Sequence, residues 1–189
     1  MRQIDQSFCL PRTSIAVVDC GATGEALLTR AVLESLGAAV ILHRPGTPKD
    51  FLRLLRQPDA AASTLVICAH GDASGIVFGA YAPEIDTSCL VNGSLPAHAI
   101  AGAVRLPGWI VLSTACGTGA VAFGQAFTDG GVRAYIAPGS EPEGADVPLF
   151  LHHFFHHLIC RGGEVEAAWA RARGYDEQSA MFVLHSGIH

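Results

Sequence analysis

The fold of this chain is decided by two apolar runs that stop in small residues, Leu65-Val66-Ile67-Cys68-Ala69-His70-Gly71-Asp72 and Ile110-Val111-Leu112-Ser113-Thr114-Ala115-Cys116-Gly117-Thr118-Gly119. Continuous apolar runs of four or five residues are typical of parallel strands buried on both faces, and the small residues after them predict loops at the carboxyl edge of a sheet. Ligand and catalytic sites of open α/β sheets lie at that edge. One run brings His70 to the edge and the other brings Cys116, so the sequence predicts that these side chains lie near each other.

Composition favours a single globular domain over residues 1–189, because half of the chain is hydrophobic and only 15% is charged. The formal net charge of -5 and the lack of a Lys/Arg-rich stretch argue against a nucleic-acid partner. No apolar run approaches 18 residues, so we expect no membrane-spanning segment.

The cysteines and the N-terminus favour a reducing, cytoplasmic location. Residues 1–12 are mixed in polarity and lack the apolar stretch of a secretory signal. The six cysteines are scattered without a C-x-x-C pair, which favours free thiols over a disulfide framework; they are Cys9, Cys20, Cys68, Cys89, Cys116 and Cys160.

Strand and helix patterns alternate along the chain. In addition to the two runs above, strands are predicted at 14–19, 38–42, 132–137 and 180–184, with a short β piece at 75–79. Helical spacing of apolar residues predicts helices at 25–36, 48–57, 96–104, 119–127, 147–160 and 164–173. This alternation predicts a three-layer α/β sandwich, in which a mostly parallel sheet of about six strands has helices on both faces.

A histidine and a cysteine at one sheet edge can support nucleophilic catalysis. A thiol of ordinary pKa, about 8.5, is only a few per cent thiolate at neutral pH, so it needs a neighbouring base. His70 could act as that base and later as the acid that protonates an amine leaving group. Backbone N–H groups of Gly71 and Cys116 could form the oxyanion hole. The separation of 46 positions in sequence between His70 and Cys116 leaves room for a helical crossover between parallel strands.

Each residue alone has a commoner structural role. A histidine that ends a strand is usually structural or solvent-facing, and a lone cysteine such as Cys68 is usually a small buried hydrophobe. The two together carry more weight. Ala115-Cys116-Gly117 with a histidine about 50 residues upstream is close to a caspase-type signature, with Thr114 and Thr118 replacing its Gln and its last Gly.

The chain resembles the caspase-like (clan CD) cysteine peptidases over roughly residues 64–189, and within them the CHAT domains most closely. The shared pieces are Ala69-His70-Gly71, Ser74-Gly75-Ile76-Val77-Phe78, Leu106-Pro107-Gly108 and 112–119, where Thr114 is an inserted residue. The resemblance implies a thiol protease with no metal or organic cofactor, a peptide or protein substrate, and a separate targeting or activating protein. One departure concerns 137–143, where these domains commonly carry an apolar-Trp segment that helps to form the substrate pocket.

Acidic residues near the expected site raise the question of substrate charge. Glu141, Glu143 and Asp146 follow the fifth strand, and no Arg or Lys lies between Gly139 and Leu151. We expect an acidic pocket to favour cleavage after Arg or Lys, with Asp146 as the pairing carboxylate. Asp146 falls where the resemblance puts an acidic residue in the Arg-cleaving separases. A solvated loop is the alternative.

Two further carboxylates lie close to the expected dyad. Asp19, at the end of the first strand, could line the pocket or cap the next helix. Asp72 could orient His70, although neighbours in sequence seldom have that geometry.

Three other interpretations fit parts of the sequence. The first is a non-catalytic caspase-like binding or assembly module that retains the dyad. The second is a general α/β hydrolase or flavodoxin-like binder, but G-x-S-x-G is missing and Gly21-x-x-Gly24 lacks the rest of a phosphate loop. The third is a metal site at His152-His153-Phe154-Phe155-His156-His157. The same spacing fits the polar face of an amphipathic helix, so no metal site is expected there.

Overall fold

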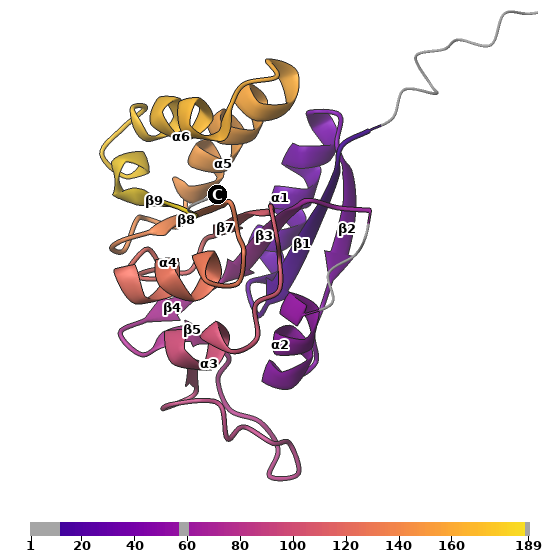
Figure 1. Cartoon of the computed structure of the whole chain (residues 1–189), viewed down its shortest axis with the longest axis vertical. Helices are drawn as coiled ribbons and strands as arrows, with labels where there is room; N and C mark the ends of the chain where they lie inside the picture. The colour runs from indigo at the N-terminus through magenta and orange to yellow at the C-terminus, as the bar shows by residue number, and fades with distance from the viewer. Residues whose placement is uncertain (1–11, 57–60, 188–189) are drawn as a thin grey trace, which may run out of the picture.

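The computed structural model describes residues 12–56 and 61–187 (Figure 1). Three sequence expectations fall outside the described residues: the polar segment 1–11, Cys9 within it, and Gln57, the last residue of the predicted second helix.

A six-stranded sheet forms the middle of the molecule, in the order β2-β1-β3-β7-β8-β9. All neighbouring strands are parallel except β8 and β9, which are antiparallel. This confirms the predicted α/β class and the mostly parallel sheet. The strands are β1 (Ser14–Cys20), β2 (Ala39–His43), β3 (Thr64–Ala69), β7 (Ile110–Ser113), β8 (Ala134–Pro138) and β9 (Phe182–Ser186).

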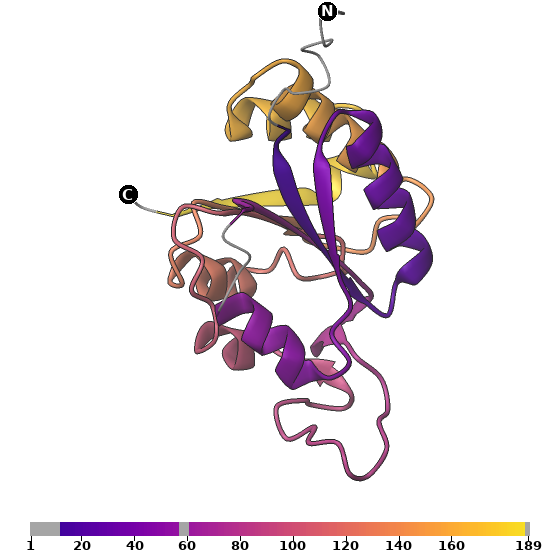
Figure 2. The same ribbon diagram turned by 90° about the vertical axis from the view of Figure 1, so that its right-hand side faces the viewer.

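Helices cover both faces of this sheet (Figure 2). One apolar cluster joins alternate strand residues such as Val17 and Val66 to α1 (Thr23–Ser35), α5 (Val147–Phe155) and α6 (Val165–Arg173). The other joins the intervening residues, such as Val18 and Ile67, to α2 (Pro48–Arg56), α3 (Ala97–Ala101) and α4 (Val121–Thr128). Successive strand residues point to opposite faces, so strands buried on both faces produce two cores.

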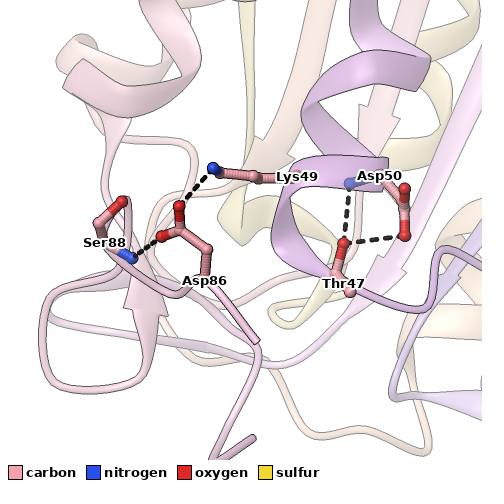
Figure 3. Close-up of polar contacts among 5 residues, drawn as sticks. All are labelled: Thr47, Lys49, Asp50, Asp86 and Ser88. Carbon is pink, nitrogen blue, oxygen red and sulfur yellow. Dashed lines mark hydrogen bonds and ion pairs between the residues drawn. The ribbon is translucent and has the colours of Figure 1, made fainter. Parts of the chain in front are cut away.

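Local polar contacts fix the start of α2 (Figure 3). The Thr47 hydroxyl accepts a hydrogen bond from the Asp50 N–H at 3.1 Å and donates to the Asp50 carboxylate at 2.8 Å. This exchange satisfies an N–H group that has no partner within the helix. Lys49, in the first turn of α2, forms an ion pair with Asp86, which ties the loop between β5 (Gly75–Val77) and β6 (Ser94–Leu95) to the helix.

Several elements differ from the sequence expectations in extent. The helix expected at 147–160 is α-helical only to Phe155 and continues as a π-helical turn, η2 (His156–Cys160). The helix expected at 96–104 is α-helical only at 97–101. A second, small antiparallel sheet consists of β4 (Gly71–Asp72), β5 and β6. Strand β6 was not predicted, because two residues are too few to show an alternating pattern.

Within 12–56 and 61–187, no helix combines the length and the apolarity that crossing a bilayer requires.

Candidate active site

Neighbouring strands β3 and β7 end beside each other, as expected for the His70 and Cys116 strands. Their parallel register pairs Ile67 with Ser113. Thr114 then fastens the two strand ends together. Its N–H donates to the Ile67 carbonyl at 2.9 Å, and its hydroxyl accepts from the Ala69 N–H at 3.2 Å. Thr114, the inserted residue of the Cys116 motif, therefore has a structural role between the two strands.

The backbones that follow these strands are in direct contact. A Cβ built on Gly71 would lie 2.7 Å from the Cys116 nitrogen and closer still to the Cys116 carbonyl oxygen. Only glycine allows this approach without displacing one of the two loops. His70 lies directly before Gly71 with an exposed side chain, and its carbonyl accepts a hydrogen bond from Val77 at 2.9 Å. The structure thus brings the backbone of the His70-Gly71 pair against that of Cys116.

Buried hydrogen bonds hold the loop that carries Cys116. The Ser113 hydroxyl accepts from the Ala115 N–H at 3.2 Å, and the Thr118 hydroxyl donates to the Ala115 carbonyl at 2.6 Å. The buried Tyr135 hydroxyl donates to the Thr118 carbonyl at 3.0 Å, and Gly117 N–H donates to the Ser140 carbonyl at 3.1 Å. Such a satisfied network fixes the position of the thiol between two flanking loops.

The surroundings of Cys116 disfavour the thiolate in the resting protein. Its thiol is half-buried, and burial, followed by the negative field of Glu141, raises its pKa above the ordinary value. A weaker contribution in the same direction comes from Glu25, whereas the Cys116 backbone N–H acts to lower the pKa. The Cys116 thiol is therefore neutral in the resting protein.

A cavity of about 450 Å³ opens beside Cys116. Residues from the β4 turn, from the start of α4 and from the loop after β8 line it, among them Ser74, Phe123 and Glu141. Ser74 supplies a polar wall, Phe123 an apolar wall, and Glu141 a negative charge. This volume lies in the range of ordinary small-ligand and side-chain pockets.

Glu25 is a site-proximal residue that sequence reasoning missed. It occupies the first turn of α1, and its Oε1 atom is buried and has no hydrogen-bond partner among the described residues. Burial raises the pKa of this carboxyl group, and the Thr114 hydroxyl, the positive charge of His70 and the Cys68 thiol offset part of that rise. A buried carboxyl group without a full set of hydrogen-bond partners is costly to keep, which makes Glu25 a candidate functional residue.

The alignment of α1 with β3 places Glu25 near His70 at the carboxyl edge of the sheet. The Cys68 thiol donates to the Thr29 hydroxyl at 3.6 Å, which aligns the middle of α1 with the end of β3. Glu25 lies one helical turn, about 5.4 Å, nearer the carboxyl edge than Thr29. His70 lies two residues, about 6.6 Å, beyond Cys68 in the same direction. The sequence shows an acidic residue in the first turn of the helix that follows the first strand. It does not show how that helix is aligned with the strand that leads to His70.

The other two expected carboxylates near the dyad are engaged in turns. Asp19 accepts from the Gly21 N–H at 3.1 Å and the Thr23 hydroxyl at 2.8 Å, and it pairs with Arg44 at 3.3 Å. These contacts hold the turn before α1, whose N-cap residue is Ala22 and which has no side-chain cap hydrogen bond. Asp72 accepts from the Ser94 hydroxyl at 2.7 Å, which is the main reason that its pKa is lowered.

Asp146 occupies the N-cap position of α5 and is half-buried. Among the described residues lining the cavity beside Cys116, Glu141 is present, and Asp19 and Asp146 are not. Glu141 is thus the carboxylate of this loop that the structure brings next to the thiol.

No model of a known protein family matches this chain, and no curated protein matches its sequence. Solved structures do match its fold. A chain of the Saccharomyces cerevisiae separase–securin complex superposes with a TM-score of 0.56 and 11% identity over 94% of this chain. Gingipain R, an Arg-specific cysteine proteinase, superposes with a TM-score of 0.57 and 11% identity over 92%. The fold is caspase-like. The aligned region covers 12% of the first chain and 46% of the second, and at this identity the likeness shows the fold alone.

Proposed function

We propose that this chain is a caspase-like cysteine endopeptidase, most similar to the CHAT domains, with Cys116 as nucleophile and His70 as general base and acid. The observation that carries the proposal is the contact between the Gly71 backbone and Cys116, which a side chain at position 71 would prevent. It joins the two motifs at the carboxyl edge of adjacent parallel strands, where sites of such sheets form.

The proposed mechanism begins from a neutral thiol. Because burial and Glu141 raise the pKa of Cys116, His70 takes the thiol proton as sulfur attacks the scissile carbonyl carbon. The N–H groups of Gly71 and Cys116 then stabilise the oxyanion. His70 returns the proton to the amine leaving group as the C–N bond breaks. Water, activated by the same imidazole, hydrolyses the thioester and restores the thiol.

Glu25 is proposed as the group that positions His70. Its carboxylate lies in the first turn of α1, one of its oxygens is buried without a hydrogen-bond partner among the described residues, and the positive form of His70 stabilises its charge. By reciprocity, the carboxylate stabilises the imidazolium that forms when His70 takes the thiol proton. This arrangement compensates for a nucleophile that is not ionised in advance.

We propose a preference for cleavage after Arg or Lys, with Glu141 as the pairing carboxylate. What supports this is that Glu141 and Cys116 line one cavity. A cationic side chain bound to Glu141 would also cancel the negative field that raises the pKa of Cys116. Binding of the correct substrate would thereby help to ionise the nucleophile. Asp146, at the start of α5, is the alternative carboxylate.

A separate protein partner and a reducing, cytoplasmic location are part of the proposal. One structural neighbour was solved in complex with securin, a protein bound to separase. The described cysteines carry free thiols, which suits a reducing compartment.

A non-catalytic binding or assembly module is the second candidate. The raised pKa of Cys116 favours it, because many active-site cysteines lie in surroundings that lower the pKa. Under this alternative the cavity beside Cys116 would bind a peptide without cleaving it.

The proposal is tested with fluorogenic peptides that differ only in Arg, Lys or Asp before the scissile bond. We expect the wild type to cleave the Arg and Lys peptides, Cys116→Ala and His70→Ala to have no activity, and Cys89→Ala, a second half-buried cysteine, to retain it. The effects of the two active-site changes should be strongly non-additive. Within the same panel, Glu141→Gln and Asp146→Asn identify the pairing carboxylate. Binding of these peptides without cleavage would support the assembly module instead.

A further inference from the structure

A second cavity, of about 520 Å³, is lined by six basic side chains: His152, His153, His156, His157, Arg161 and Arg171. We propose that this cavity binds a small phosphate-bearing anion with several negative charges, and that it binds the anion more tightly as the pH falls. The proposal is independent of the peptidase assignment.

The cavity lies at the edge of the sheet opposite to Cys116. Helix α5 starts after the loop at the carboxyl end of β8 and runs back towards the amino ends of the strands. At its end, the Cys160 thiol lies 3.7 Å from the carbonyl of Leu36, which follows α1 and precedes β2. The four histidines therefore belong to a site separate from the dyad.

A folded-back loop completes the cavity. The Gly163 N–H donates to the His157 carbonyl at 3.2 Å, and a Cβ at position 163 would lie 2.5 Å from two atoms of the His157 ring. This close packing turns the chain after η2 so that Arg161 faces the histidines, while Arg171 comes from α6. Single π-helical turns are frequent at functional sites.

The positive charge in this cavity is poorly balanced. Within the described part of the chain, neither Arg161 nor Arg171 forms an ion pair with a carboxylate. By contrast, two basic side chains on α2 are paired, Lys49 with Asp86 and Arg53 with Asp50 (Figure 3 shows the first pair). An anion would provide the compensation that the protein itself provides on α2.

The histidines repel one another's positive forms. The rings of His152 and His156 are stacked with centroids 6.0 Å apart. Burial, then His152 and His156, and finally Arg171 lower the pKa of His153, against the opposing effect of Asp176. The ring of Tyr175 also packs against the His153 ring, with 4.3 Å between the two centroids.

A bound anion would reverse this balance. Its negative charge would pair with protonated imidazoles, so binding takes up protons and affinity must rise as pH falls.

The chemistry of the lining selects a phosphate group over a metal ion. Arginine recognises phosphate through paired N–H donors, and the volume falls in the range of small-molecule sites. Among the described residues, no three His, Cys, Asp or Glu side chains are arranged to hold a metal ion.

The test is isothermal titration calorimetry of the whole chain with tripolyphosphate at near-physiological salt. We expect binding at least about tenfold tighter at pH 6 than at pH 8. Replacing both Arg161 and Arg171 by Gln should weaken binding at least about tenfold at pH 6 and leave peptidase activity unchanged. Replacing His152 and His156 by Gln should remove most of the pH dependence. The matched control replaces Arg53 and Arg56 by Gln, which removes the same charge from α2, and should leave affinity unchanged.

Three results would overturn the proposal: no binding at pH 6, equal weakening by the α2 control, or saturable Zn²⁺ binding in place of phosphate binding. Thermal unfolding of each variant verifies that it is folded. ADP, compared with pyrophosphate, distinguishes a nucleotide from a free phosphate chain as the source of the anion.

Discussion

Gly71 lies so close to the Cys116 backbone that a Cβ at position 71 would be 2.7 Å from the Cys116 nitrogen. Residue 71 follows β3 and residue 116 follows β7, so this contact sets the separation of the two loops that carry the proposed dyad. It also places the two proposed oxyanion-hole donors next to each other.

The Gly71→Ala variant should lose about 1–3 kcal/mol of unfolding free energy, because the added methyl group overpacks against backbone that cannot yield. Its peptidase activity should fall by more than the folded fraction explains, because the oxyanion hole is distorted. Urea denaturation and a peptide assay measure both. Gly102→Ala is the control, since a Cβ there meets nothing within 4 Å and its φ is -78°. Equal losses of stability and activity in the two variants would show that the contact between Gly71 and Cys116 is not needed.

Thr114 should stabilise the junction of β3 and β7 through its hydroxyl group. In Thr114→Ala the buried Ala69 N–H loses its 3.2 Å acceptor, which should cost about 1–3 kcal/mol of unfolding free energy. Thr114→Ser keeps the hydroxyl group and should lose distinctly less. Urea unfolding of the three proteins measures the difference, and an equal loss in both variants would assign the effect to the methyl group instead.

Glu141 should slow the ionisation of Cys116 in the absence of substrate. Its charge is the second cause, after burial, of the raised pKa of the thiol. Removing that charge in Glu141→Gln lowers the pKa, so at a pH below it the thiolate fraction and the alkylation rate rise, by about two- to fivefold for a screened charge. Rates of iodoacetamide labelling across pH 6 to 10 give the shift. Glu143→Gln, an exposed change on the same loop, should leave the profile where it is.

Glu25 should favour activity at the expense of stability. Its pKa is raised in the folded protein, so the stability it contributes is full below the unfolded pKa and is lost as pH rises through the folded pKa. At neutral pH the Glu25→Gln variant should therefore be more stable than the wild type, yet cleave peptide at least about tenfold more slowly. Glu34→Gln, on the exposed side of the same helix, should retain activity. A variant that loses stability at neutral pH would indicate a structural role instead.

Much of the fold was predictable because the inner strands of the central sheet, β1, β3, β7 and β8, are buried on both faces and their sequences are correspondingly apolar. The β3 and β7 runs are continuously apolar since helices cover both faces of the sheet. Both runs then stop at small residues, which placed His70 and Cys116 at the carboxyl edge. The small β4-β5-β6 sheet lacked such a signal, because pairs such as Ser94–Leu95 are too short for periodicity.

The finer parts of the site were not predictable because they depend on how distant elements pack. Glu25 is ordinary as a helix-start residue and becomes notable only when α1 lies against the end of β3. Glu141 and Asp146 look equivalent in sequence, yet only the first lines the cavity beside Cys116. The inserted Thr114 looked like a departure from a motif, and its hydroxyl group proves to join two strand ends.

Competitive alkylation tests whether His70 serves Cys116 as a base. Folded protein is treated near pH 6 with limiting iodoacetamide, and peptide masses give the labelling of Cys116 relative to the exposed Cys160. The ratio of Cys116 labelling to Cys160 labelling should be the same in the wild type and in His98→Gln, which changes an exposed histidine on α3. In His70→Gln the labelling of Cys116 should fall at least about tenfold while Cys160 is unchanged. Equal labelling of Cys116 in the wild type and in His70→Gln would contradict the account.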